Sequence, residues 1–185
     1  MSQSIELARL KALKRYEVLD TPPDGAYDCI TAIASKMFNM PIALITLVDE
    51  DRIWFKSKYG LDDPNQIPKE PGLCASAILS DEVYVVENAK QDPRTLENQL
   101  VKGDFGLEFY AAAPLKTRGG HRIGNFCVID KKPRYLNTEQ ISLLEDLAQI
   151  VVDQFELRLN ALNEVRQMKE KINTLKKRLH LESET

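Results

Sequence analysis

A long segment without helix-breaking residues dominates the C-terminal part of this chain, because no Pro or Gly occurs from Asn137 to Thr185. The Asn137 side chain can cap the first free backbone N–H groups, and Gln140 can reach back from three residues later. Apolar residues are dense as far as Leu159 and thin to spacings of three and four after Leu162. The pattern predicts one helix that starts packed in a domain and continues as a coiled-coil-like extension.

Composition limits the classes of protein to which the chain can belong. It has 185 residues, with 25 Lys and Arg against 28 Asp and Glu and a formal net charge of −3, which argues against bulk nucleic-acid binding. The longest apolar run, 40–48, is too short to span a membrane. The first twenty residues carry charges where a secretory signal needs an apolar stretch. We therefore expect a cytoplasmic protein with no nucleic-acid or membrane partner.

Cysteine and histidine usage predicts neither a disulfide framework nor a metal site. The three cysteines, Cys29, Cys74 and Cys127, are odd in number and widely spaced. Neither histidine, His121 or His180, lies at ligand spacing from a cysteine. We expect no metal in this chain.

Two helices are predicted before the first strand. The segment 5–18 is amphipathic, and a second helix is expected with Thr21 as its N-cap and Pro22 in its first turn, running to about Asn39. The core-facing side of this second helix is predicted to carry its apolar residues, which are Ala26, Cys29, Ile30, Ile33, Ala34 and Met37.

Four strands are predicted in two hairpins, 41–49 with 52–59 and 107–116 with 122–130. The Gly119-Gly120 pair supplies the positive backbone φ angles of a tight turn. The stretch 60–106 between the hairpins is rich in Pro, Asp, Asn and Gly, with a short helical piece at 73–79 and a strand at 83–87. Such a long irregular segment typically has a functional role.

Six segments in this order resemble the GAF domain of bacterial signalling proteins: Leu19–Pro23, Pro41–Asp49, Asp51–Ser57, Cys74–Leu79, Phe109–Leu115 and Ile123–Asp130. The resemblance implies an α+β fold with a central antiparallel sheet of five to six strands. It also implies N- and C-terminal helices on one face, a loop-covered small-molecule pocket on the other, and dimers through the helices. On this basis we divide the chain into an N-terminal helix (1–20), a GAF domain (21–160) and a helical extension (161–185).

Strand alternation selects candidate ligand-binding residues on the side of the loop-rich lid. Together with Cys74 they are Trp54, Lys56, Tyr110, Phe126 and Asp130. An aromatic wall with one or two charges suits a planar or acidic ligand. The alternative is that Trp54 and Phe126 are a second layer of core that fills a collapsed cavity.

Cys74 and Cys127 are the redox candidates. Cys74 begins a short helix, where backbone N–H groups can lower a thiol pKa, but a buried small hydrophobe is the alternative. The enzymatic relative within the family is a free-methionine-sulfoxide reductase, which needs two or three converging cysteines. A bilin is not expected, since pigment-binding relatives pair their cysteine with a histidine and Cys74 is followed by Ala75. Cyclic-nucleotide binding is not expected either, since the Asn-Lys-Phe-Asp-Glu signature of those relatives is not recognisable in this chain. We expect no cofactor and no enzymatic activity.

The predicted function is that of a sensor that binds an unidentified small molecule and passes a signal to an output partner through a homodimer. The alternatives are a cysteine-based redox protein and a purely structural dimerisation module. The dimer is assigned to apolar helix positions, namely Leu10, Leu13, Val151, Phe155, Leu162, Val165, Met168, Ile172, Leu175 and Leu179.

Overall fold

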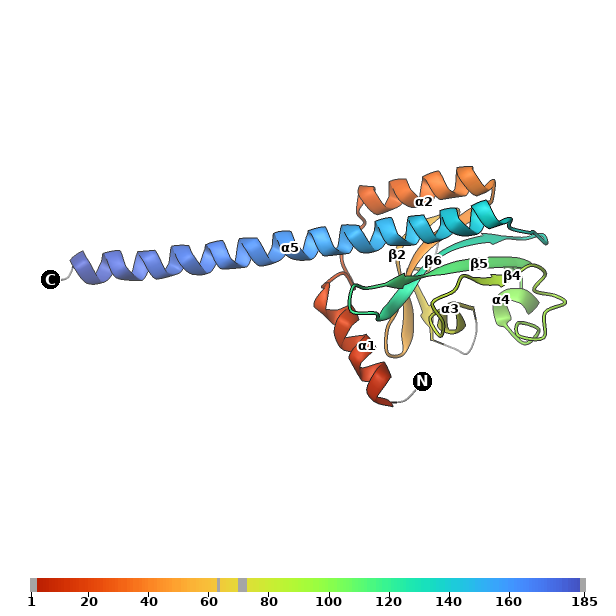
Figure 1. Ribbon diagram of the computed structural model, residues 1–185, viewed down its shortest axis with the longest axis horizontal. Coiled ribbons are helices and arrows are strands. Elements are labelled where there is room, and N and C mark those ends of the chain that lie inside the picture. The colour runs from red at the N-terminus through yellow and green to blue at the C-terminus, as the bar shows by residue number, and fades with distance from the viewer. Residues whose placement is uncertain (1–2, 63, 70–72, 184–185) are drawn as a thin grey trace.

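A six-stranded antiparallel sheet forms the centre of the computed structural model, in the order β3-β2-β1-β6-β5-β4 (Figure 1). The structure describes residues 3–62, 64–69 and 73–183, and the side chains as far as Lys177. The helices are α1 (Gln3–Arg15), α2 (Gly25–Phe38), α3 (Leu73–Ala77), α4 (Gln99–Lys102) and α5 (Thr138–Ser183). The strands are β1 (Ile42–Val48), β2 (Arg52–Tyr59), β3 (Gln66–Pro68), β4 (Tyr84–Val86), β5 (Phe109–Lys116) and β6 (Arg122–Asp130). The predicted α+β class is confirmed.

Both faces of the sheet are covered. Helices α2 and α5 lie along one face, and α3, α4 and their connecting loops cover the other (Figure 1). All seven residues of β1 are buried, so neither side of this central strand meets solvent. We call the two sides the helix side and the lid side.

Helix α2 starts later than predicted. Asp24, not Thr21, is its N-cap and accepts a hydrogen bond from the backbone N–H of Ala26 at 3.1 Å. The Thr21 hydroxyl instead donates to the carbonyl of Val18. Pro22 cannot open the helix because it precedes Pro23, and a residue before proline is disfavoured in the helical region.

The buried face of α2 also differs from the predicted one. Its buried residues are Tyr27, Thr31, Ala34, Ser35 and Phe38. The polar members are hydrogen-bonded, Thr31 to the Ser57 hydroxyl at 2.9 Å and Ser35 to the Met40 carbonyl at 2.6 Å. Most of the apolar stripe therefore turns outward: Ala34 is buried and Ile30 half-buried, but Ala26, Cys29, Ile33 and Met37 are exposed.

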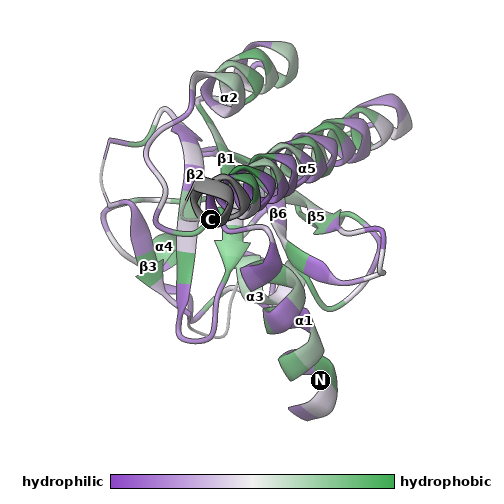
Figure 2. Ribbon diagram, turned by 90° about the vertical axis from the view of Figure 1, so that its left-hand side faces the viewer, coloured by the Kyte–Doolittle hydropathy of each residue, from purple (hydrophilic) through white to green (hydrophobic). Residues whose placement is uncertain are grey.

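Helix α1 crosses the end of the sheet, on the opposite side of α5 from α2 (Figures 1 and 2). The guanidinium of Arg9, only 2% exposed, donates to the carbonyl of Val48 at 2.5 Å and forms an ion pair with Glu6. Glu6 also pairs with Lys69 at 2.8 Å. These contacts fasten α1 to the end of β1 and to the lid.

The Glu6 cluster predicts an acid-dependent stability difference. Hydrogen bonding from Arg9, with a smaller contribution from Lys69, lowers the pKa of Glu6 from 4.5 to about 2. A carboxylate with a lowered pKa stabilises the fold fully above its unfolded pKa, and that stabilisation is lost as the pH falls through about 2. Glu6→Gln should therefore cost about 1–2 kcal/mol at neutral pH, allowing for solvent screening, and progressively less toward pH 2.

Urea unfolding of the wild type and Glu6→Gln across this pH range measures the difference. Glu50→Gln, in the exposed β1–β2 turn, is the control and should show no comparable gap. A Glu6→Gln deficit that persists undiminished in acid would contradict the charge-based account.

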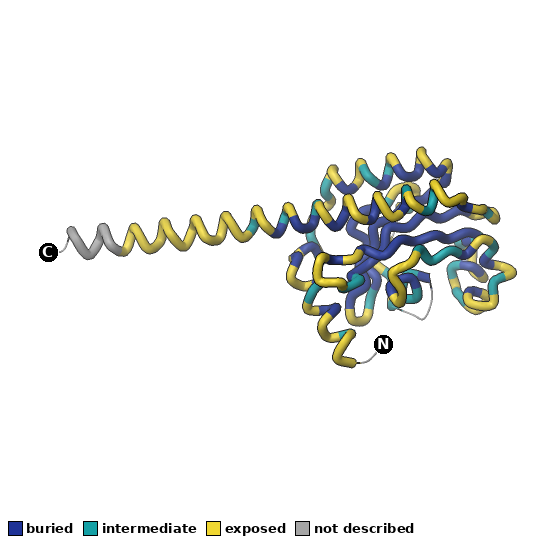
Figure 3. The backbone as a smooth tube through the Cα atoms, in the orientation of Figure 1, coloured by how far each residue is buried: buried dark blue, intermediate teal, exposed yellow. Residues whose placement is uncertain are grey.

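The predicted C-terminal helix is present as α5. Asn137 caps it, accepting from the backbone N–H of Gln140 at 2.8 Å, while the Gln140 side chain accepts from the Asn137 N–H at 3.1 Å. The helix leaves the domain and continues as an exposed rod (Figure 3). Among the described residues, no helix has the length and apolar character that crossing a membrane requires.

Candidate functional site

An apolar cavity of about 320 Å³ lies on the lid side of the sheet. Its floor comes from β1, β2, β5 and β6, and its walls come from α3, α4 and the loops around β3. It is lined by Leu44, Ile53, Phe55, Leu61, Pro64, Ile67, Pro68, Leu73, Cys74, Ala75, Asn98, Gln99, Leu100, Phe105, Leu107, Tyr110 and Ile129. None of these described lining residues is charged, and the two charged candidates, Lys56 and Asp130, are not among them.

A cluster of two thiols and a phenol borders this cavity. The Tyr110 hydroxyl donates to Cys74 Sγ at 3.3 Å. Cys74 packs against the buried cluster that contains Cys127, and the side chains of Cys127 and Thr46 lie close enough to affect the pKa of the Cys74 thiol. Cys74 is partly accessible and lines the cavity, whereas Cys127 is buried behind it.

The two thiols differ in acidity. The hydrogen bond from Cys127, helped by Tyr110 and Thr46, lowers the pKa of Cys74 although burial opposes this. The same contact with Cys74, together with burial, raises the pKa of Cys127 well above its ordinary value. Cys74 is therefore the member of the pair that ionises first.

Asn125 holds Cys74 in place and was not among the residues selected from the sequence. Its side chain is fully buried, and its Nδ2 donates to the backbone carbonyl of Cys74 at 2.9 Å. The Thr46 hydroxyl in turn donates to the Asn125 carbonyl at 3.3 Å. An amide in the middle of an otherwise apolar strand is the signal that points to such a role, because a buried amide needs a partner.

Four of the six candidate ligand residues do not line the lid-side cavity, which corrects the predicted grouping. Trp54 and Phe126 belong to the helix-side core, and Lys56 points to the same side. Asp130 pairs with Arg134 at 2.6 Å, and Arg134 donates to the carbonyl of Asn39 at the end of α2. Cys74 and Tyr110 are the two candidates that the fold brings together in the cavity.

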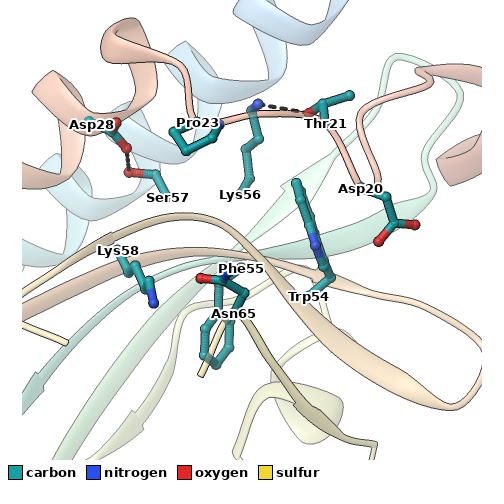
Figure 4. Close-up of a pocket in the computed structure, with 10 residues that line it drawn as sticks. All are labelled: Asp20, Thr21, Pro23, Asp28, Trp54, Phe55, Lys56, Ser57, Lys58 and Asn65. Atoms are coloured by element: carbon teal, nitrogen blue, oxygen red, sulfur yellow. Dashed lines mark hydrogen bonds between the residues drawn. The ribbon is translucent and has the colours of Figure 1, made fainter. Parts of the chain in front are cut away.

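A second cavity, of about 430 Å³, opens on the helix side beside β2 (Figure 4). Lys56, 4% exposed, reaches across it and donates to the Thr21 hydroxyl at 2.9 Å and the Pro22 carbonyl at 3.2 Å. Its ammonium lies 5.0 Å from the centre of the Tyr27 ring. Burial lowers the pKa of this ammonium, and Asp24 and Asp28 oppose the shift.

Several polar groups of this second cavity already have protein partners. Asp28 accepts from the Ser57 hydroxyl at 2.7 Å, which ties α2 to β2. Asp20 pairs with Arg52 at 2.7 Å, which ties the linker between α1 and α2 to β2. Across the described part of the chain, no three His, Cys, Asp or Glu side chains gather in a way that could hold a metal ion.

The sequence profile of the GAF domain family matches residues 22–154, and the chain belongs to this family. It is 38% identical over 148 residues to a cyclic di-GMP phosphodiesterase of Pseudomonas aeruginosa. That match covers 80% of this chain but only 25% of the phosphodiesterase.

Solved structures show the same fold. The GAF domain of a phosphoenolpyruvate-protein phosphotransferase from Acinetobacter superposes with a TM-score of 0.60 and 18% identity, over 90% of this chain and 99% of that one. A free methionine-R-sulfoxide reductase from Neisseria meningitidis, solved with its substrate, gives a TM-score of 0.62 and 20% identity, over 87% of this chain and 95% of that one. Both superpositions support the predicted GAF fold.

Proposed function

We propose that this chain is a sensory GAF domain that binds a neutral, apolar small molecule in the lid-side cavity. The observation that carries the proposal is a cavity of about 320 Å³ with no charged side chain among the lining residues that the structure describes. Small-molecule sites are typically largely apolar with a few polar groups, here Cys74, Tyr110, Asn98 and Gln99. An anionic ligand would lose its hydration at this site without meeting a cation among the described lining residues.

The two cavities differ in what they offer a ligand. On the helix side the charged groups bind the linker, so a ligand would have to displace contacts that hold the domain together. On the lid side the apolar walls face open volume. Trp54 and Phe126 do not fill this volume, which removes the packing that the collapsed-cavity alternative assumed.

Binding of a neutral hydrophobic dye such as N-phenyl-1-naphthylamine tests the ligand site. We expect saturable binding to the wild type and at least about tenfold weaker binding to Ala75→Phe, which places a ring in the cavity. Asp28→Asn, which alters the helix-side cavity, is the matched control and should bind like the wild type. Equal binding to Ala75→Phe and the wild type, or stronger loss in Asp28→Asn, would place the ligand elsewhere.

We also propose that the domain forms a parallel homodimer, through a face that differs from the predicted one. Leu10 is 8% exposed, and Leu13, Val151 and Phe155 are fully buried within one chain, so these four cannot form an interface. Leu162 is half-buried, and the side chain of Leu179 lies outside the described residues. Four predicted positions remain exposed, Val165, Met168, Ile172 and Leu175.

The exposed apolar stripe of α5 is continuous from the domain into the extension. Ile150 and Leu157 are 46% and 62% exposed, and Ala161, Val165, Met168, Ile172 and Leu175 follow at spacings of three and four. Beside it, α2 exposes Cys29, Ile33 and Met37. Because these exposed positions share one face of α5 from Ile150 to Leu175, a second copy aligned in parallel covers that face, and α2 adds a four-helix arrangement at the domain.

Sedimentation equilibrium tests this interface. We expect the wild type to dimerise and Leu157→Glu to weaken the dimer by at least about tenfold, because a carboxylate is buried against apolar groups. Asn163→Glu, exposed on the opposite side of the same helix, introduces the same charge and should leave the dimer intact. A monomeric wild type, or a dimer unaffected by Leu157→Glu, would overturn the proposed interface.

The name of the relative, a cyclic di-GMP phosphodiesterase, supports a signalling output. The matched phosphodiesterase is a much longer protein, of which this chain corresponds to a quarter. We propose that ligand binding shifts the balance between two arrangements of paired α5 helices, which a connected output domain would read. Such a shift requires different ligand affinities in the two arrangements.

A further inference from the structure

Among the described residues that line the lid-side cavity, Cys74 carries a reactive thiol. Cys74 lines the cavity, its Sγ accepts from the Tyr110 hydroxyl at 3.3 Å, and it packs against the buried cluster that contains Cys127. A thiol that meets a cavity on one side and a second thiol on the other has the arrangement of a reacting and a resolving cysteine. Neither thiol is in a disulfide.

We propose that Cys74 and Cys127 form a dithiol switch that is oxidised by an apolar organic hydroperoxide bound in the lid-side cavity. The inference rests on the proposed ligand site and names the chemical class of its ligand. The lining favours a hydroperoxide whose organic group, R, is apolar. Cys74 is the side chain in the described lining that can reduce a peroxide bond.

The reaction balances in two steps. The Cys74 thiolate attacks the terminal oxygen of R–O–O–H, so that an S–O bond forms, the O–O bond breaks, and the alcohol R–OH leaves with the proton that the thiol gave up. The Cys127 sulfur then attacks Cys74 Sγ, an S–S bond forms, and the sulfenic oxygen leaves as water with the proton of Cys127. The hydroperoxide is reduced by two electrons and the two thiols are oxidised by two.

The surroundings support each step. Hydrogen bonds from Cys127, Tyr110 and Thr46 favour the thiolate of Cys74, which is the reactive form of a cysteine. The side-chain amide of Asn125 donates to the backbone carbonyl of Cys74 at 2.9 Å. Because Asn125 lies on β6, this hydrogen bond holds α3 against the strand that carries Cys127. Oxidation therefore joins α3 of the lid covalently to the central sheet.

Mass spectrometry of the full chain in a Cys29→Ser background tests the switch, since Cys29 is the exposed third thiol. After brief treatment with cumene hydroperoxide we expect a mass loss of two hydrogen atoms, a linked Cys74–Cys127 peptide and full reversal by dithiothreitol. Adding Cys127→Ser should stop the reaction at a one-oxygen gain on Cys74. Adding Cys74→Ser should abolish it, and Tyr110→Phe should slow it several-fold.

Three outcomes would overturn the inference: no linked peptide, oxidation of Cys74 in the wild type no faster than that of exposed Cys29, or an unchanged rate in Cys74→Ser. Equal rates with cumene hydroperoxide and hydrogen peroxide would overturn the apolar substrate class.

Dye binding separates the two proposals. A protein that binds the dye but forms no disulfide keeps the ligand site and loses the switch, and one that forms the disulfide without binding the dye loses the ligand site.

Discussion

Phe155→Ala is expected to lower the free energy of unfolding by about 3–5 kcal/mol, the usual cost of removing a fully buried aromatic ring. Phe155 is 0% exposed, and its ring centre lies 6.0 Å from that of Tyr16 and 5.4 Å from that of Tyr27. It thus joins α5 to α2 and to the segment after α1. Little of the resulting space can be refilled, because the partner side chains Tyr16 and Tyr27 are themselves buried in the same core.

Leu157→Ala, two residues further along α5, is the matched control because Leu157 is 62% exposed. Urea unfolding at several protein concentrations compares the two variants. Phe155→Ala should be destabilised at every concentration, whereas Leu157→Ala should lose stability only where dimers contribute, since subunit association stabilises by mass action. Similar losses for both at the lowest concentration would show that the assignment of core and surface faces on α5 is incorrect.

The elements could be predicted from the sequence because their signals are local. The Asn137–Gln140 capping box stands where the residues indicate. The Gly119-Gly120 turn joins β5 and β6 as predicted, with a positive φ of +78° at Gly120 but not at Gly119. The two hairpins also pair as expected. Each signal depends on a few neighbouring residues and their backbone geometry.

The face on which each residue lies could not be predicted in the same way. Strand alternation divides β2 into two sets, but both sides of the sheet are buried, so nothing local tells which set faces the lid. Ile53 and Phe55 line the lid-side cavity, while Trp54 and Lys56 face α2. The predicted ligand set therefore mixed residues from both sides.

The buried faces of the helices were predicted incorrectly for a related reason. In the first part of α5 apolar residues occur on every side, so Val151, Phe155 and Leu157 look alike in sequence although they are 0%, 0% and 62% exposed. In α2 the apolar stripe is largely outward, because Thr31 and Ser35 satisfy their hydroxyls inside the fold. Hydrogen bonds to distant segments determine the orientation of a helix, and a local pattern does not contain them.

Gly124→Ala is expected to destabilise the domain by at least about 3 kcal/mol, near the upper end for overpacking a core. A Cβ at this position would lie 2.0 Å from the Thr46 carbonyl oxygen and 3.0 Å from Leu47 Cα. Both are backbone atoms of β1, so relief requires β1 and β6 to separate. The neighbouring pair, Thr46 opposite Asn125, also holds the contact to Cys74.

Gly119→Ala provides the control, because its Cβ would meet nothing closer than a side-chain atom of His121 at 3.4 Å. It should change the unfolding free energy by less than about 1 kcal/mol. Urea unfolding gives the stability of both variants, and the rate of Cys74 alkylation in folded protein reports on the lid. Gly124→Ala should both unfold at lower urea and alkylate faster at Cys74, because the strand that places Asn125 has moved. A stable Gly124→Ala domain with an unchanged alkylation rate would mean that β1 and β6 are less tightly joined than the structure requires.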